Sequence, residues 1–178
     1  MSVRAALRTA TRESHDAVDR LFGRFDLSDA TGYRGFLAAN RAAFVPVERA
    51  IDLAGGDMVL EDWPQRRRAA LLIADVTDME AGAVPDVATP ALTRPAGVLG
   101  AIYVLEGSRL GGTLLRRSLL PAWPARFLHA PAEPGSWPNL ISTLETRLAR
   151  PEDLQAAIDA ARAVFRCFET AAQQDRKC

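Results

Sequence analysis

The stretch 97-GVLGAIYVLEGSRLGGTLLRRSL-119 decides the expected fold. Its apolar residues recur every three or four positions, which is the period of an α-helix. Pro95 suits a first helical turn, so the helix is expected to begin there and to continue to about Leu120. A helical wheel at about 100° per residue places Gly100, Gly107 and Gly111 within about 40° of one another. The stretch therefore predicts a long helix with a strip of bare backbone along one face.

The glycines make this helix costly to form. Each glycine inside a helix costs ~1 kcal/mol relative to alanine, so Gly100, Gly107, Gly111 and Gly112 together weaken the element by about 4 kcal/mol. Something close to the backbone must offset that cost. Either a second helix packs tightly against the bare face, or a flat ligand lies against the main chain, with Gly111 and Gly112 letting the helix bend over it. The residues alone leave both explanations open.

Further helices are predicted on both sides of this stretch. The apolar spacing favours helices over residues 3–22, from a cap at Ser28 or Asp29 to about Leu53, over 64–80, over about 139–148 and over 152–174. Pro46 lies inside the second of these and suggests a bend. The prolines in 81–95 and 121–138 predict irregular connections.

The predicted fold class is all-α, with about six or seven helices. No alternating β-branched run is long enough for a sheet, and no internal repeat is visible. A chain of 178 residues lies in the usual one-domain range, so residues 1–178 are expected to form a single helical domain, with 175–178 as a disordered tail.

Composition and charge exclude several classes of protein. Lys and Arg number 22 and Asp and Glu number 22, a balance that argues against a nucleic-acid binder. No stretch approaches ~18 uncharged apolar residues, so no membrane segment is expected. Two cysteines near the C-terminus, Cys167 and Cys178, fit a reducing compartment. The chain is expected to be cytoplasmic.

A histidine in the first predicted helix is the other candidate for chemistry. On the wheel, His15, Arg8 and Asp19 fall along one edge of the apolar stripe. Arg8 and His15 are separated by roughly 10 Å along the helix axis, enough to hold a ligand at its centre and at an acidic margin. The alternative is a boundary histidine bonded only to the aspartate.

The two segments together carry a resemblance. The segment LRTATRESHDAVD, followed about ninety residues later by LEGSRLGG and then by the closing stretch ARPEDLQAAIDAARAVF, resembles the haem oxygenase family, particularly its short bacterial members associated with bilin synthesis. The likeness runs through nearly the whole chain. It implies a helical bundle that cleaves haem to biliverdin, CO and ferrous iron, with O2 and with electrons from an external ferredoxin or reductase.

On the proximal side of the haem, the resemblance assigns four residues. His15 matches the family's iron ligand, and Asp19 matches an acidic residue that tunes the imidazole by hydrogen bonding. Arg8 matches a basic residue that pairs with a haem propionate. Phe165 matches an aromatic residue at the haem pocket.

On the distal side, the resemblance assigns glycines. Gly107 and Gly111 match glycines whose backbone approaches the iron-bound ligand, and Gly112 follows in the same run. Many family members have an aspartate after the first of these glycines, where this chain has Ser108. The catalytic residues predicted from the resemblance are therefore Gly107, Ser108 and Gly111.

Other positions are left open by the sequence. A second basic propionate partner falls on Ile141, and the residues that would substitute for it are Arg109, Arg116, Arg147, Arg162 and Arg166. The cluster Arg66-Arg67-Arg68 is interpreted as a solvated helix face, with docking of an acidic electron donor there or at Arg116-Arg117 as the alternative.

Two other functions compete with haem cleavage. One is a haem carrier or sensor that does not degrade haem, suggested by Ser108 in place of the acid. The other is a protein of the related thiaminase-like architecture, or an interaction module, in which the glycines serve only helix packing. The position of both cysteines near the C-terminus argues against the thiaminase-like chemistry.

Overall fold

The computed structural model of the protein describes residues 2–174, apart from the side chains of Thr113 and Leu114. The described residues form helices and no strand, which confirms the all-α prediction. Six helices have ten or more residues: α1 (Val3–Phe22), α2 (Ala30–Leu53), α5 (Ala69–Asp78), α6 (Pro95–Leu115), α8 (Ser136–Arg147) and α9 (Pro151–Gln174). The single-turn helices α3 (Gly56–Val59), α4 (Trp63–Arg66) and α7 (Arg126–His129) raise the total slightly above the predicted six or seven. The predicted tail, 175–178, lies outside the described residues.

The starts of α1 and α2 are fixed by capping side chains next to them in sequence. The Ser2 hydroxyl accepts a hydrogen bond from the N–H of Ala5 at 3.2 Å. The Asp29 carboxylate accepts one from the N–H of Gly32 at 3.0 Å. Each cap satisfies an amide that has no partner within its helix. Both predicted starts are confirmed, and α2 continues through Pro46.

The single helix predicted over 64–80 is wrong. The chain leaves the helical conformation at Arg67, which has φ −60° and ψ 137°, so that α4 and α5 are separate. The carboxylate of Glu48, on α2, accepts hydrogen bonds from the N–H groups of Arg68 at 2.7 Å and Ala69 at 3.1 Å. The first amides of α5 are thus satisfied by a side chain from another helix, a contact that local periodicity does not reveal.

The predicted extent of α6 also needs correction. The α-helix ends at Leu115 and not near Leu120, and a 3₁₀ turn, Arg116–Ser118, follows it. The predicted irregular connection 121–138 contains the short helix α7 and the first turn of α8.

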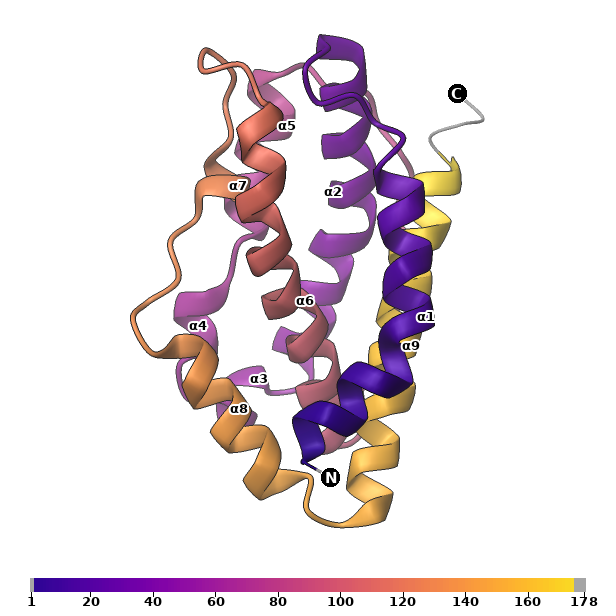
Figure 1. The fold of residues 1–178 in the computed structure, drawn as a ribbon, viewed down its shortest axis with the longest axis vertical. Coiled ribbons are helices and arrows are strands. Elements are labelled where there is room, and N and C mark those ends of the chain that lie inside the picture. The colour runs from indigo at the N-terminus through magenta and orange to yellow at the C-terminus, as the bar shows by residue number, and fades with distance from the viewer. Residues whose placement is uncertain (1, 175–178) are drawn as a thin grey trace.

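Helix α9 is the element around which the others pack. It contacts α6, α1 and α2, and Figure 1 shows α1 alongside it, α6 facing α1, and α2 behind these two helices. A Cβ atom on Gly100 of α6 would overlap the backbone carbonyl of Ala157 on α9. The missing side chain therefore allows α6 and α9 to approach closely at this level of the bundle. No helix in the described part of the chain is long and apolar enough to cross a membrane.

Candidate functional site

His15 lies on the exposed side of α1, and one of its ring nitrogens has a partner. Its side chain is 59% exposed, and its Nδ1 lies 3.1 Å from Oδ2 of Asp19, one turn later. The Phe165 ring of α9 stands edge-on to the imidazole, with the ring centroids 5.9 Å apart. Nε2 has no hydrogen-bonding partner among the described residues. The imidazole is therefore held through Nδ1 and offers Nε2 to a ligand.

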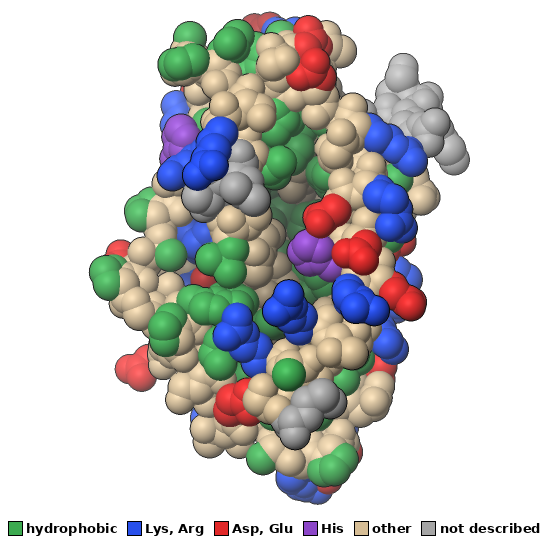
Figure 2. All heavy atoms as spheres, in the orientation of Figure 1, with side chains coloured by type: hydrophobic (Ala, Val, Ile, Leu, Met, Phe, Trp, Pro, Cys, Tyr) green, Lys and Arg blue, Asp and Glu red, His purple; other side chains and the backbone are tan. Residues whose placement is uncertain are grey.

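The molecule is hollowed between α1 and α6. Figure 2 shows hydrophobic side chains at depth in this hollow, a histidine at its α1 margin, and Lys or Arg side chains gathered below that histidine. Among the described residues, no atom beyond their own helix lies within 4 Å of the positions that a Cβ would occupy on Gly107 and Gly111. These two glycines therefore present bare backbone to open space. Gly112 points elsewhere, since its Cβ would lie 3.3 Å from the Leu128 side chain.

A tyrosine of α6 that the sequence did not single out lies close to two arginines of α1. Tyr103, on α6, is half-buried, and the charges of Arg4 and Arg8 on α1 both act on its hydroxyl. Burial raises the pKa of Tyr103 and outweighs those two charges and a hydrogen bond with the side chain of Thr11, so the phenol stays protonated and able to donate. Tyr103 is four residues before Gly107, and this spacing, which puts both on one helix face, was the available signal.

Ser108, the residue in place of the family's aspartate, is engaged by its own helix and by Arg68. Its hydroxyl donates to the carbonyl of Leu105 at 2.6 Å and accepts from Nη2 of Arg68 at 3.0 Å. The Arg68 guanidinium lies 4.9 Å from the ring centroids of both Phe44 and Phe127. Burial, together with the nearby charge of Arg109, lowers the pKa of Arg68 to about 9. Because the Ser108 hydroxyl donates its proton to the Leu105 carbonyl, it can accept a hydrogen bond from a water but cannot donate one to it.

The interpretation of Arg66-Arg67-Arg68 as a solvated face is wrong for two of its three members. Arg66 and Arg68 are buried, whereas the Arg67 side chain is 43% exposed and pairs with Asp52. Burial also excludes Arg66 and Arg68 as a docking surface for an acidic donor. Arg116 and Arg117 are exposed, as the solvated interpretation expects.

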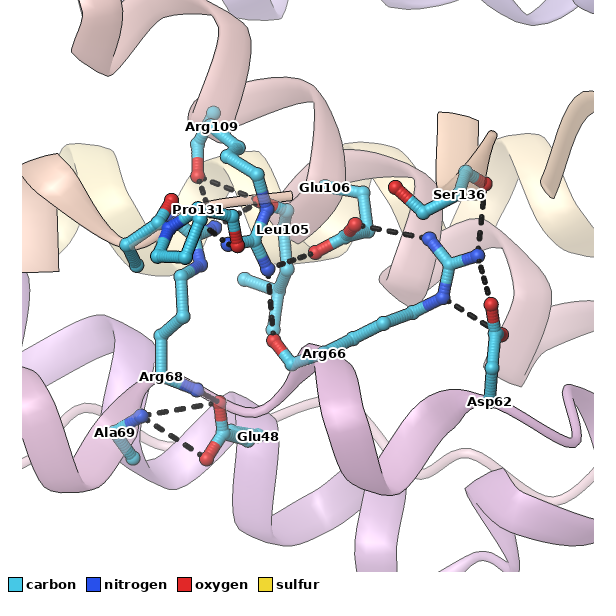
Figure 3. Close-up of polar contacts among 12 residues, drawn as sticks. Glu48, Asp62, Arg66, Arg68, Ala69, Leu105, Glu106, Arg109, Pro131 and Ser136 are labelled. Carbon is cyan, nitrogen blue, oxygen red and sulfur yellow. Dashed lines mark hydrogen bonds and ion pairs between the residues drawn. The ribbon is translucent and has the colours of Figure 1, made fainter. Parts of the chain in front are cut away.

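The buried arginines belong to an ionic cluster behind α6, drawn in Figure 3. Arg66 bonds to Asp62 and to Glu106, and Arg109 bonds to the other oxygen of Glu106. A recess of about 90 Å³ borders this cluster, but its charged walls already neutralise one another. We therefore place the candidate site in the hollow and not in this recess.

The candidates for a second propionate partner are separated by the structure. Ile141 is partly buried on α8, and Arg109 is taken up by the cluster behind α6. Arg162 donates through Nε to the carbonyl of Ala10, so it lies beside α1. The remaining candidates, Arg116, Arg147 and Arg166, form no side-chain ion pair with another described residue, so no such contact places them beside α1.

Comparison with known proteins finds heme oxygenases both among sequence relatives and among solved structures. No protein-family model matches the chain. A heme oxygenase of Xanthomonas campestris pv. campestris (strain 8004) is 34% identical over 120 residues, which are 64% of this chain and 72% of that protein. The crystal structures of a NO- and CO-bound heme oxygenase from Neisseria meningitidis align over 98% of this chain and 92% of that one, with a TM-score of 0.78 and 19% identity. A heme oxygenase from Leptospira interrogans aligns over 97% and 98%, with a TM-score of 0.74 and 20% identity. The sequence relative, together with this agreement in fold, shows that the chain belongs to the haem oxygenase family.

Proposed function

We propose that this chain binds haem in the hollow between α1 and α6 and cleaves it to biliverdin, CO and ferrous iron, using O2 and electrons from a separate ferredoxin or reductase. The observation that carries the proposal is the pairing of two features across the hollow. One is His15 with a free Nε2, and the other is the bare backbone at Gly107 and Gly111. A planar macrocycle fits between an imidazole and a helix face without side chains. Membership of the family supports the reaction.

On the α1 side, we assign the binding of iron to His15. Asp19 faces Nδ1 at 3.1 Å and so favours the tautomer whose proton is on that nitrogen, which leaves the Nε2 lone pair for iron. The Phe165 ring lies beside the imidazole and limits its rotation. His15 would hold the iron as a neutral imidazole, and the bound haem would supply the activation of O2.

At the basic end, we assign the propionates to Arg8 and Tyr103. Arg8 is exposed on α1 and its charge reaches the Tyr103 hydroxyl, so a carboxylate placed between them meets a cation and a neutral donor. Holding this edge of the haem fixes its rotation in the hollow. That orientation decides which meso carbon lies beneath the bound oxygen.

On the α6 side, Gly107 and Gly111 leave the space that O2 needs, and Ser108 contributes an acceptor for a water. No side chain of these three residues is a strong acid. A weakly acidic surface would not promote cleavage of the O–O bond, and this would favour oxidation of the haem itself. The roles of Gly107, Ser108 and Gly111 are part of the proposal, whereas Gly112 faces Leu128 and is given no role in it.

The test is a titration with haemin of the wild type, His15→Ala and His129→Ala. His129, on α7, is exposed and is the matched control because it is the second of the two histidines. We expect a sharp Soret band for the wild type and His129→Ala, and a weakened or shifted band for His15→Ala. Ascorbate and air should then replace the band with a bilin spectrum. Absence of haemin binding would refute the proposal. A Soret band that survives aerobic reduction would instead indicate a haem carrier or sensor that does not degrade haem.

A further inference from the structure

Glu106 is a buried carboxylate that joins two arginines directly beside the glycine face. It is 4% exposed and immediately precedes Gly107. Its Oε2 accepts from Nη1 of Arg66 at 2.9 Å, and its Oε1 accepts from Nη2 of Arg109 at 2.9 Å. Figure 3 shows the two guanidinium groups approaching the carboxylate from different sides. Both oxygens are thus engaged by charge-assisted hydrogen bonds, which are the strong kind.

Arg66 connects Glu106 to elements outside α6. It donates to both oxygens of Asp62, at 2.8 and 2.6 Å, and to the carbonyl of Ser136, at 2.8 Å. Through Arg66, the carboxylate of Glu106 is attached both to α4 and to the first residue of α8.

Arg109 connects the next turn of α6 to the same region. Its Nη2 donates to the carbonyl of Arg66 at 3.0 Å, and its Nη1 reaches the carbonyls of Ala130 and Pro131 at 3.3 and 3.2 Å. The ionic cluster formed by Asp62, Arg66, Glu106 and Arg109 therefore ties α6 to α4 and to the connection that precedes α8.

The ionic cluster lies behind the glycine face. At about 100° per residue, Glu106 and Arg109 point roughly 100° and 160° away from Gly107. On the glycine side no described residue of another element packs against Gly107 or Gly111, and Leu110, between them in the sequence, is 56% exposed. Glycines also weaken this half of α6. The position of its backbone must therefore be fixed from behind.

We propose that Glu106 is a positioning residue: by holding Arg66 and Arg109 at once, it fixes how far the backbone of Gly107 and Gly111 stands from His15 across the hollow. The anchoring is a property of the protein alone. Its consequence for haem, which is control of the space above the iron, rests on the proposed function.

The first experiment measures amide hydrogen exchange in the ligand-free protein for wild type and Glu106→Gln. Glutamine keeps the shape but loses the charge that both guanidinium groups require. We expect exchange to rise about tenfold in peptides covering 106–115 and to stay unchanged in peptides covering 96–105, since local opening is set by local contacts. Arg109→Lys, which keeps the charge but loses the planar fork, should produce a smaller increase in the same peptides.

Two controls separate positioning from general destabilisation. Glu152→Gln removes an exposed ion pair with Arg150 and should leave exchange in α6 unchanged. Phe36→Leu weakens the packing of α2 against the Phe22 ring of α1 and should raise exchange without preference for 106–115. Equal increases in both halves of α6 with Glu106→Gln, or no increase, would overturn the proposal.

A second readout uses the haemin complex. Glu106→Gln should retain haemin binding through His15 but broaden the Soret band and change the proportions of bilin isomers. An unchanged Soret band and unchanged isomer proportions, alongside faster exchange, would overturn the link to haem while leaving the anchoring. If the wild type binds no haemin, the proposed function fails, whereas the exchange experiment still decides the anchoring.

Discussion

The two halves of α6 use glycine in opposite ways. In the N-terminal half, Gly100 faces α9 so closely that a side chain would strike the Ala157 carbonyl. In the C-terminal half, a Cβ atom on Gly107 or Gly111 would have no atom of another described element within 4 Å. The first half is held by helix packing, and the second is held by an ionic cluster on its other side. The two explanations that the sequence left open, a tightly packed helix and an open face for a ligand, thus apply to different parts of one helix.

Arg66→Met should have the largest effect, because it removes the ion pair that ties Glu106, in the C-terminal half of α6, to α4. The side chain is 3% exposed, and its loss leaves the buried Glu106 with one cationic partner. Breaking a buried ion pair by removing one partner costs about 3–5 kcal/mol. Urea unfolding measures this loss. Arg67→Met, at the exposed neighbour, should cost less than about 1 kcal/mol; equal small losses would show that the cluster does not hold α6.

Gly100→Ala should come next, and it tests the N-terminal half. The new methyl group meets backbone and not a flexible side chain, so α6 and α9 must separate, at a cost of about 3 kcal/mol in unfolding free energy. Gly97→Ala is the matched control, since its Cβ would lie 3.6 Å from the Ala160 Cβ, an ordinary contact. It should be neutral or stabilising by up to about 1 kcal/mol, because alanine favours the helix. A harmless Gly100→Ala would contradict the close approach of the two helices.

The features that the sequence predicted well depend on neighbours in the chain. The starts of α1 and α2 follow from Ser2 and Asp29, each three residues from the amide that it caps. The pairing of His15 with Asp19 follows in the same way from their spacing of one helical turn. Such contacts are present in any helix with this sequence, whatever surrounds it.

The features that the sequence did not predict depend on distant residues. The break before α5 is stabilised by Glu48, 20 residues from Arg68 in the chain. From sequence alone, an arginine is expected to be exposed unless its partners are known. The partners of Arg66 include Glu106, 40 residues away in the chain. For the same reason the sequence pointed to Gly107 and Gly111 but not to the cluster that holds them.

Gly107→Ala and Gly111→Ala should change stability less than Gly100→Ala does. They should raise the unfolding free energy, whereas Gly100→Ala should lower it. With open space at both positions, alanine should stabilise the ligand-free protein by up to about 1 kcal/mol each. The same methyl groups should weaken haemin binding, because they occupy the space assigned to the ligand. Gly112→Ala should gain less, since its Cβ would lie 3.3 Å from Leu128. Loss of stability in the ligand-free Gly107→Ala protein would show that this face is packed and not open.

The smallest expected effect is a change in how stability depends on pH. It distinguishes Asp62, which binds Arg66 of α4, from Glu48, which binds the first amides of α5. Burial acts to raise the pKa of Asp62, but hydrogen bonds and charge from Arg66 outweigh burial and keep this pKa below its ordinary 3.8. Asp62 therefore contributes stability that is present above pH 3.8 and is lost as the pH falls through its lower folded-state value. Burial raises the pKa of Glu48 above 4.5 despite the amides of Arg68 and Ala69, so its contribution has the opposite sign. Stability that is present below pH 4.5 is lost as the pH rises toward the raised value.

Both contributions are measured by the unfolding free energy of three proteins: the wild type, Asp62→Asn and Glu48→Gln. The pH should range from about 2.5 to 7, so that it spans the ordinary pKa values of 3.8 for aspartate and 4.5 for glutamate. The gap between wild type and Asp62→Asn should narrow as the pH falls below 3.8, because protonated Asp62 no longer differs in charge from asparagine. Glu48→Gln should lose the decline that the wild type shows above pH 4.5. A gap for Asp62→Asn that stays constant with pH would mean that Arg66 does not favour the ionised carboxylate. In that case the ionic cluster would hold α6 by hydrogen-bond geometry alone, and charge would no longer distinguish its C-terminal half from its N-terminal half.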